Sequence, residues 1–249
     1  MPTVLIAGGG SGIGRAAALR LREQGHDVHI ADRDGTAAQQ VIDEAALQPG
    51  SGSASACDLS SMAGPAEAVA AAVELTGRLD VVVVCAALLV ERTLDDFTLD
   101  DWDATMALNL RAPFFLVQAA APHLRVSEAG RVILIGSTAA FRGGSGSFAY
   151  AASKGGLVAL TRSLAVSLAA DRVCVTCVCP GWIDTAFNDP YWDRVGRSGA
   201  SREALDARIP LGAEGRPDDV AALIAFLASP DSRYLTGQSI VVDGGMLAS

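Results

Sequence analysis

Residues 3–17 read TVLIAGGGSGIGRAA, an apolar run that leads through a glycine-rich turn into an alanine-rich stretch. Glycine has no side chain, so the backbone of this turn can bend tightly and approach a bound group closely. A helix that begins directly after the turn offers free backbone N–H groups and the positive end of its dipole. The segment therefore predicts a strand, a pyrophosphate-binding turn and a helix, although a plain tight turn is the alternative. The residues expected to contact the pyrophosphate are Gly8, Ser11, Gly12, Ile13 and Gly14.

The same succession of apolar run and helical stretch repeats almost to the end of the chain. Most runs are continuously apolar, which is typical of strands buried on both faces of a parallel sheet. We expect strands at 4–7, 28–31, 54–57, 81–86, 132–135, 173–178 and 239–242. We expect helices at 12–24, 36–47, 64–76, 100–124, 151–169 and 217–228. This order predicts an α/β fold with a doubly wound parallel sheet (a Rossmann fold), seven strands and helices on both faces.

The length of 249 residues suits a single Rossmann-type domain over residues 1–249. Two segments interrupt the rhythm. Residues 49–53 (PGSGS) are expected to form a flexible surface turn, and residues 186–215 mix proline and glycine with aromatic and charged side chains. The second segment follows the sixth strand and so lies at the carboxyl end of the sheet, where open α/β folds bind ligands. We expect it to be a substrate-binding lid.

The composition indicates a globular protein of the cytoplasm. Half of the residues are apolar, mean hydropathy is +0.32, and the longest apolar run, residues 81–90, is too short to cross a membrane. The first residues show no basic segment or cleavage site, so we expect no secretory signal. A net charge of −9 argues against nucleic acid and anionic lipid as partners and leaves a small molecule as the expected one.

Five cysteines raise the possibility of a metal or disulfide site. Cys174 and Cys177 form a CxxC, but they lie in an expected strand, where this spacing points them to opposite faces. Cys177 and Cys179 share a face, yet their β-carbons are expected roughly 6.6 Å apart, too far for a disulfide. We therefore expect buried thiols in a reducing compartment and no metal site.

Acidic residues end the second and third strands. Asp32 follows Gly14 by 18 residues, close to the spacing of a carboxylate that binds an adenosine ribose and repels a 2′-phosphate. Arg33 beside it could hold that phosphate, and Asp32 could instead be a turn or N-cap residue. We favour NAD over NADP as the cofactor. Asp58 and Leu59 are placed to flank the adenine.

Tyr150 and Lys154 lie one helical turn apart on a single face. A free tyrosine has a pKa near 10, and a nearby ammonium favours the phenolate, so the pair predicts a tunable acid/base. Lys154 is the only lysine among the nineteen Lys and Arg residues. This site requires a compact ammonium with an adjustable pKa, whereas arginine supplies the positive charge at every other basic position of the chain.

Two further polar residues are candidates for the same site. Ser137 ends the fifth strand, 13 residues before Tyr150, where its hydroxyl could bind a substrate oxygen or simply cap a turn. Asn109 interrupts an apolar helical stretch, where asparagine is costly and usually exposed; facing inward, it would need a partner.

From residue 3 to about 247 the chain resembles the short-chain dehydrogenase/reductase family, with the weakest match over 186–215. Its glycine turn is similar to that family's cofactor turn, with Ala7 where threonine is usual. Residues 179–185 (CPGWIDT) resemble the family's Pro-Gly segment, and residues 216–245 its last helix and strand. The residues that match the family's catalytic tetrad are Asn109, Ser137, Tyr150 and Lys154.

The resemblance implies roles for these residues. Tyr150 would exchange the proton, Ser137 would hold the substrate oxygen, and Lys154 would bind the nicotinamide ribose and lower the pKa of Tyr150. Asn109 would support Lys154 through a water. The cofactor pocket would also include Pro180, Gly181, Ile183 and Thr185, together with Cys85 and Ala86.

One segment departs from the family's pattern. Val84-Cys85-Ala86-Ala87 stands where Asn-Asn-Ala-Gly is usual, so two amides that tie neighbouring strands together are lost. No proton-transfer group is lost with them. We expect NAD to bind more weakly than in relatives that keep the asparagines.

Three functions compete at this stage. The first is an NAD-dependent dehydrogenase of an uncharged secondary alcohol, either cyclic or linear, because the expected pocket is apolar and aromatic. The second is an NADPH-dependent 3-oxoacyl-thioester reductase with a basic docking face of Arg125, Arg131 and Arg172. The third is a nucleotide-binding regulator without turnover, against which the tetrad argues. The family usually pairs its long apolar helices between subunits, so we expect a homotetramer. The expected pocket residues are Leu88, Leu89, Phe141, Phe148, Trp182, Phe187, Tyr191 and Trp192.

Overall fold

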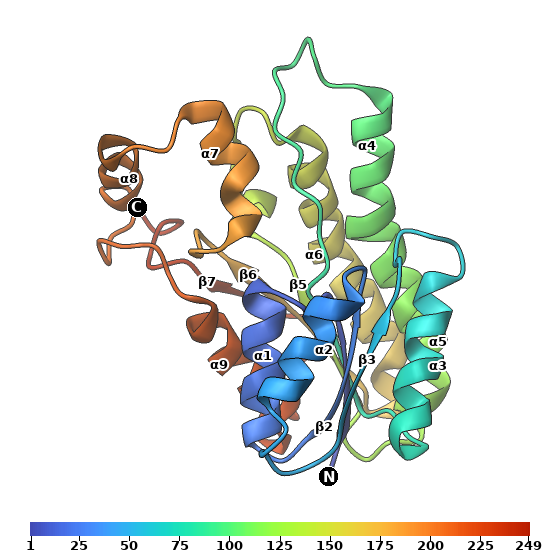
Figure 1. The fold of residues 1–249 in the computed structure, drawn as a ribbon. Helices are drawn as coiled ribbons and strands as arrows, with labels where there is room; N and C mark the ends of the chain where they lie inside the picture. The colour runs from blue at the N-terminus through green and yellow to red at the C-terminus, as the bar shows by residue number, and fades with distance from the viewer.

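A computed structural model describes all residues from 1 to 249 and contains one seven-stranded sheet (Figure 1). Every neighbouring pair of strands is parallel, in the order β3-β2-β1-β4-β5-β6-β7. This arrangement confirms the predicted fold class and its seven strands. The strands are β1 (Thr3–Ala7), β2 (Asp27–Asp32), β3 (Gly52–Ala56), β4 (Val81–Val84), β5 (Arg131–Ile135), β6 (Cys174–Pro180) and β7 (Ser239–Val242).

Helices cover both faces of the sheet (Figure 1). One layer contains α1 (Gly12–Glu23), α2 (Gly35–Glu44) and α9 (Pro217–Ala228). The other contains α3 (Gly64–Thr76), α5 (Ala112–Arg125) and α6 (Phe148–Leu168). The remaining helices, α4 (Leu99–Met106), α7 (Asp189–Val195) and α8 (Gly199–Asp206), lie beyond the carboxyl ends of the strands. No helix is both long enough and apolar enough to cross a membrane.

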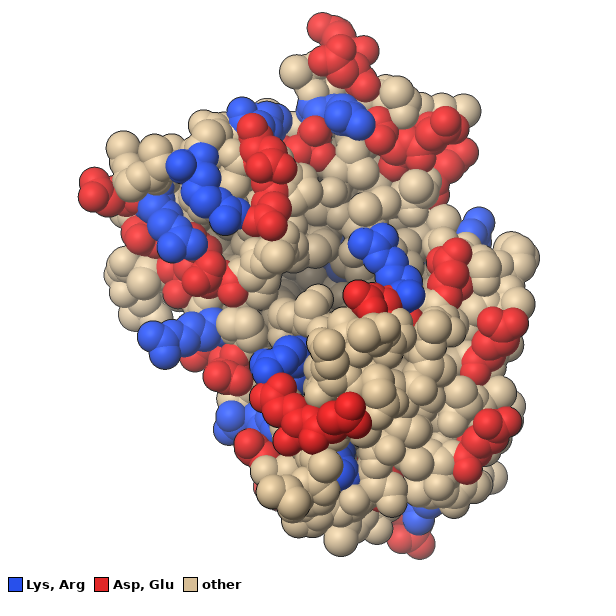
Figure 2. All heavy atoms as spheres, in the orientation of Figure 1, with Lys and Arg blue, Asp and Glu red and all other residues tan.

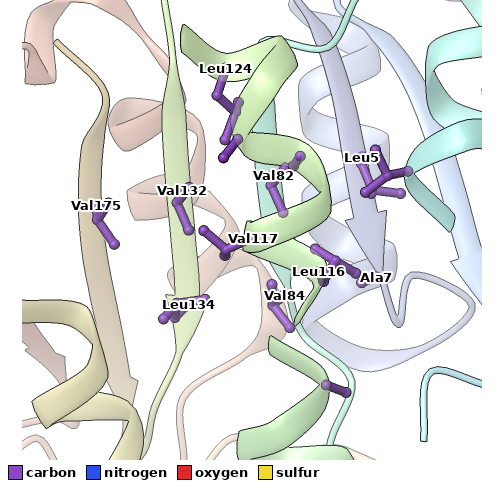
Figure 3. Close-up of a cluster of buried hydrophobic side chains, with 14 of the residues drawn as sticks. Leu5, Ala7, Val82, Val84, Leu116, Val117, Leu124, Val132, Leu134 and Val175 are labelled. Atoms are coloured by element: carbon purple, nitrogen blue, oxygen red, sulfur yellow. The ribbon is translucent and has the colours of Figure 1, made fainter. Parts of the chain in front are cut away.

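Each helical layer encloses its own apolar core. Along β1, Leu5 and Ala7 face the layer of α3, α5 and α6, whereas Val4 and Ile6 face the layer of α1, α2 and α9. Figure 3 shows the first core, where Leu116 and Val117 of α5 lie over the valines of β4 and β5. Since successive residues of the central strands are buried on opposite sides, these strands read as continuous apolar runs.

Two elements differ from the sequence-based expectation. Strand β4 ends at Val84, because the backbone N–H groups of Cys85 and Ala86 both donate to the carbonyl oxygen of Ala7, at 2.8 and 2.9 Å, and turn the chain. The expected surface turn at 49–53 is shorter, since Gly52 and Ser53 already pair with β2 as part of β3.

The long helix expected at 100–124 is divided. A π-helical turn, Ala107–Arg111, separates α4 from α5 and includes Asn109.

The expected lid at 186–215 contains a short 3₁₀ turn, α7 and α8. Trp192, Leu205, Ile209 and Met246 form a small core of their own beneath it.

The glycine turn between β1 and α1 is packed too closely for side chains. A β-carbon on Gly14 would lie 2.0 Å from the carbonyl oxygen of Gly8, and one on Gly8 would lie 2.5 Å from the backbone nitrogen of Ala86. Gly8 also has a φ of 85°, which favours glycine. These positions therefore require glycine for steric reasons that do not depend on a ligand.

Replacing Gly14 by alanine is expected to destabilise the protein by about 1–3 kcal/mol, because the backbone around Gly8 must shift. The measurement is the free energy of unfolding in urea. Gly199→Ala is the matched control, since its β-carbon would meet no atom within 4 Å. Equal stability of the Gly14→Ala and Gly199→Ala proteins would contradict the steric argument.

Candidate active site

A cleft of about 930 Å³ runs along the carboxyl edge of the sheet. Figure 2 shows it as a hollow in the centre of this face, below the part of the molecule that carries α7 and α8. The turn after β1 lines one end, and α6 and the segment after β6 line the other. All the predicted cofactor-binding and catalytic residues line the cleft except Asn109, namely Gly8, Ser11, Gly12, Ile13, Gly14, Asp32, Arg33, Asp58, Leu59, Cys85, Ala86, Ser137, Tyr150, Lys154, Pro180, Gly181, Ile183 and Thr185.

Asp32 is half-buried at the end of β2 and stabilises the glycine turn. Its Oδ2 accepts a hydrogen bond from the backbone N–H of Gly10 at 2.9 Å, and its Oδ1 accepts one from that of Asp34 at 3.0 Å. The carboxylate thus combines a local structural role with a place in the cleft. Arg33, next in the chain, is exposed and makes no hydrogen bond or ion pair with its side chain.

These features fit a dinucleotide. The glycine turn offers a cradle that β-carbons would fill, at the start of a helix and beside a strand-end carboxylate. The cleft continues from there to Tyr150 and Lys154, so one elongated ligand can reach both ends.

Asn109 is fully buried behind the cleft, and the π-helical turn aims its amide at the segment after β4. Its Oδ1 accepts from the backbone N–H of Leu88 at 2.7 Å, and its Nδ2 donates to the carbonyl oxygen of Leu88 at 2.9 Å. The same Nδ2 lies 3.2 Å from the hydroxyl oxygen of Ser153 on α6. The amide therefore finds the partners that an inward-facing asparagine needs, and it connects α6 to the segment that follows β4.

Lys154 extends from α6 toward the end of β5 and is buried. Its Nζ donates to the carbonyl oxygen of Ile135 at 2.7 Å and lies 5.5 Å from the ring centroid of Tyr150. Burial lowers the pKa of Lys154 to about 8, although the neighbouring Cys177 and Cys85 oppose the shift. Lys154 therefore remains largely protonated at pH 7, and its ammonium donates to a carbonyl oxygen.

Tyr150 and Ser137 meet at the floor of the cleft. Burial raises the pKa of Tyr150 to about 12, and a hydrogen bond with the Ser137 side chain partly offsets this shift. The direction is opposite to the one predicted from the helical spacing, because the cost of burying a phenolate dominates the shift. Ser137 also accepts from the backbone N–H of Ala139 at 3.1 Å, which fixes its side chain.

The segment that departs from the family's pattern packs into both cores. Val84 is buried against the α5 layer, and Cys85 packs against the other layer and lines the cleft. Burial raises the pKa of Cys85 to about 12, so it is a neutral thiol at pH 7. All five cysteines are free thiols, and Cys177 and Cys179 share a face with their sulfur atoms 3.7 Å apart.

The expected apolar pocket is only partly correct. Leu88, Leu89, Trp182, Phe187 and Tyr191 line the cleft, and the ring centroid of Phe187 is 5.8 Å from that of Tyr150. The residues wrongly placed in it are Phe141, Phe148 and Trp192. Phe141 is exposed elsewhere, Phe148 packs edge-on against Phe97, and Trp192 of α7 is buried in the small core that it forms with Leu205 of α8.

The end of the cleft lined by α6 and the segment after β6 is called the substrate end below. An ion pair that no sequence pattern indicates borders it. Nε of Arg194 on α7 lies 2.8 Å from Oε2 of Glu91, which follows β4 and whose side chain is 6% exposed. A β-carbon on Gly146 would lie 2.6 Å from the same carboxylate oxygen. Three segments thus converge there, and no local pattern could reveal a pair so far apart in the sequence.

Comparison with known proteins adds to this geometry. The profile of the family described as Enoyl-(Acyl carrier protein) reductase matches residues 7–247. The chain is 38% identical to the (3R)-3-hydroxyacyl-CoA dehydrogenase of Mus musculus, over 97% of this chain and 95% of that protein. It is 33% identical to the 3-oxoacyl-[acyl-carrier-protein] reductase of Thermotoga maritima, over 98% and 96%. The crystal structure of levodione reductase superposes with a TM-score of 0.94 at 28% identity, covering 100% of this chain and 98% of that one.

Replacing Asn109 by alanine is expected to cost about 1–3 kcal/mol of stability, because the polar backbone groups of Leu88 lose their buried partner. Denaturant unfolding measures the change. Ser153→Ala is the comparison variant. It removes the contact between the Asn109 amide and the Ser153 hydroxyl and leaves both hydrogen bonds to Leu88, so the loss of stability is expected to be smaller. An Asn109→Ala protein as stable as the wild type would show that the amide is dispensable.

Proposed function

The chain belongs to the short-chain dehydrogenase/reductase family, and on that premise we propose that it is an NAD-dependent oxidoreductase that interconverts a secondary alcohol and a ketone. The observation that carries the proposal is the meeting of Ser137, Tyr150 and Lys154 in one cleft with the glycine turn. The three side chains supply a hydroxyl, a phenol and an ammonium at its floor, which is the equipment for moving a proton to or from a substrate oxygen.

Members of this family use nicotinamide cofactors, which accept or donate a hydride. In this chain the glycine turn would hold the pyrophosphate and Asp32 the adenosine ribose. Asp58 and Leu59 would flank the adenine, and Lys154 would bind the nicotinamide ribose. The nicotinamide would rest against the segment after β6, through Pro180, Gly181, Ile183 and Thr185.

Tyr150 moves the proton in the proposed reaction. With a raised pKa it holds its proton at neutral pH, so it is ready to donate to a carbonyl oxygen as that oxygen gains charge. Ser137 would share a hydrogen bond with the same oxygen. In the oxidising direction Tyr150 must lose its proton first, and the Lys154 ammonium beside its ring stabilises the phenolate that results. Asn109 positions α6 rather than touching the substrate.

Asp32 supports the choice of NAD. It is the strand-end carboxylate in the cleft, and it would repel the extra phosphate of NADP. Arg33 is free to contact that phosphate, but it is more exposed than Asp32.

A 3-oxoacyl-thioester reductase is the second candidate, and the activity named for the relative from Thermotoga maritima favours it. The three arginines considered for its docking face, Arg125, Arg131 and Arg172, lie at the amino ends of the strands, away from the cleft. Arg131 begins β5 and is buried at the opposite edge of the sheet, and Arg125 is paired with Asp171 at 3.0 Å.

We also propose that residues 186–215 act as a lid and that the protein is a cytoplasmic homotetramer. The Arg194–Glu91 ion pair supports the lid, because it ties α7 to the segment after β4 across the substrate end of the cleft. Exposed Phe114, Phe115 and Val166 on α5 and α6 support assembly through these helices.

The test of the proposed function is formation of NADH from NAD, or of NADPH from NADP, at 340 nm over a panel of secondary alcohols. Tyr150→Phe is expected to lower the rate by about 10²–10⁴-fold while NADH binding, followed by fluorescence, persists. Because the phenol pKa is raised, alcohol oxidation by the wild type should accelerate as the pH rises from about 6 toward 8, the range in which Lys154 still carries its charge. Tyr234→Phe, which removes a fully exposed phenol, is the control. Unchanged turnover in Tyr150→Phe would refute the mechanism.

Cofactor preference should depend on the charge of Asp32. Asp32→Asn is expected to raise kcat/KM with NADP relative to NAD by about tenfold or more, because the repulsion of the 2′-phosphate disappears. Asp34→Asn is the matched control, since Asp34 caps α2 through the N–H of Ala37 and does not line the cleft. A ratio that changes equally in both variants would argue against the assigned role of Asp32.

A further inference from the structure

The substrate end of the cleft is positively charged, in a chain whose net charge is −9. Apart from Lys154 on the floor, its charged lining residues are three arginines and one glutamate. Their formal sum is +2, whereas the cofactor end, with two aspartates and one arginine, sums to −1. The residues at the substrate end are Glu91, Arg142, Arg194 and Arg208.

The single carboxylate at this end is already neutralised. Glu91 accepts from Arg194, which in turn is directed toward the carbonyl oxygen of Ser145 at 3.4 Å. Arg194 is the one cation paired with this buried carboxylate, and Gly146 packs close to the same oxygen. The pair therefore contributes no net charge and leaves the other two arginines unbalanced.

Arg142 and Arg208 make no hydrogen bond or ion pair with their side chains. Arg142 is half-buried in the loop after β5, which also carries Ser137, and Arg208 follows α8 in the segment that covers the cleft. Carboxylates are abundant in this protein, and the arginines paired with one are Arg15, Arg78, Arg92, Arg125, Arg194, Arg197 and Arg202. Two unpaired guanidinium groups at the substrate end of the cleft thus offer ten N–H donors and no acceptor to an incoming ligand.

Apolar side chains line the same end of the cleft. Leu88, Leu89, Trp182, Phe187 and Tyr191 supply leucine and aromatic surface next to the reacting hydroxyl. A ligand that satisfies the whole cleft therefore has an apolar body near Tyr150 and an anionic group at the rim. Guanidinium groups bind carboxylate and phosphate oxygens in paired hydrogen bonds, and a cleft lined by one sign of charge concentrates ligands of the other.

We propose that the substrate is an organic anion and that Arg142 and Arg208 bind its carboxylate or phosphate group. The proposal rests on the proposed function, since it assigns the substrate class of that same site. It replaces the uncharged alcohol expected from the sequence with an alcohol or ketone whose apolar body ends in an oxyanion. The two arginines are specificity-determining residues and take no part in proton or hydride transfer.

Binding of small probes tests the proposal without turnover. Phenylacetate and phenyl phosphate carry the two oxyanions on the same ring, and phenylacetamide is the neutral counterpart of the first. Calorimetry on the full chain is expected to show both anions binding at least about tenfold more tightly than the amide. Arg142→Gln and Arg208→Gln should each weaken the anions by about tenfold and leave the amide unchanged, and added salt should act in the same direction.

The matched control is Arg233→Gln. Arg233 is unpaired like both cleft arginines and exposed like Arg208, but its backbone contacts Cys174 at the start of β6, at the edge of the sheet opposite the cleft. The Arg233→Gln protein is expected to bind all three probes as the wild type does. Whichever anion binds more tightly identifies the group as carboxylate or phosphate. Equal binding of anions and amide, or anion binding that neither cleft variant weakens, would overturn the proposal.

Turnover separates this inference from the proposed function. Each variant is assayed with 3-hydroxybutanoate, its methyl ester and its coenzyme A thioester. The expected result is that Arg142→Gln and Arg208→Gln lower kcat/KM for an anionic substrate about tenfold and spare the ester. If the wild type oxidises neutral alcohols but shows no preference for anions, the dehydrogenase stands and the inference fails. If the anions bind selectively but no alcohol or ketone reacts, the anion site stands and the proposed function fails.

Discussion

The contact between the turn after β1 and the segment after β4 is the constraint on which the rest of the site depends. The carbonyl oxygen of Ala7 accepts two backbone N–H groups, from Cys85 and Ala86, and Gly8 packs against Ala86 at a distance that excludes a β-carbon. The sheet order reverses at this point, with β2 on one side of β1 and β4 on the other. The two strand ends diverge from here into opposite helical layers, and the crevice between them is the cleft. Because backbone atoms make the contact, it holds although the usual asparagines are absent from the segment after β4.

The catalytic end is built from polar groups whose burial is offset by specific partners. Lys154 gives its hydrogen bond to Ile135, at the end of β5, and Asn109 uses both ends of its amide on Leu88. A buried polar group without a partner costs about 1–3 kcal/mol, so each of these side chains fixes the elements that it joins. The same burial sets the acid–base properties of the site. It raises the pKa of Tyr150 and lowers that of Lys154, so both neutral tyrosine and ammonium are present at pH 7.

The substrate end is held by contacts of a different kind. α7 and α8 rest on a small apolar core and are tied to the segment after β4 by the Arg194–Glu91 ion pair. The ion pair neutralises Glu91, the one acidic side chain that lines the substrate end. The electrostatic character of the substrate end thus follows from the pairing of one residue, and the overall acidity of the chain does not predict it.

The sequence by itself determined the parallel sheet, the glycine turn, the strand-end position of Asp32 and the shared face of Tyr150 and Lys154. Each of these depends on spacing within one element or across one turn, and such local patterns have a fixed geometry. Only the tertiary structure decided the rest. The π-helical turn at Asn109, the true lining aromatics and the partner of Glu91 depend on which distant segments meet. The direction of the Tyr150 pKa shift depends on how completely those segments exclude water, because desolvation is set by the surrounding protein and not by the residue four positions away.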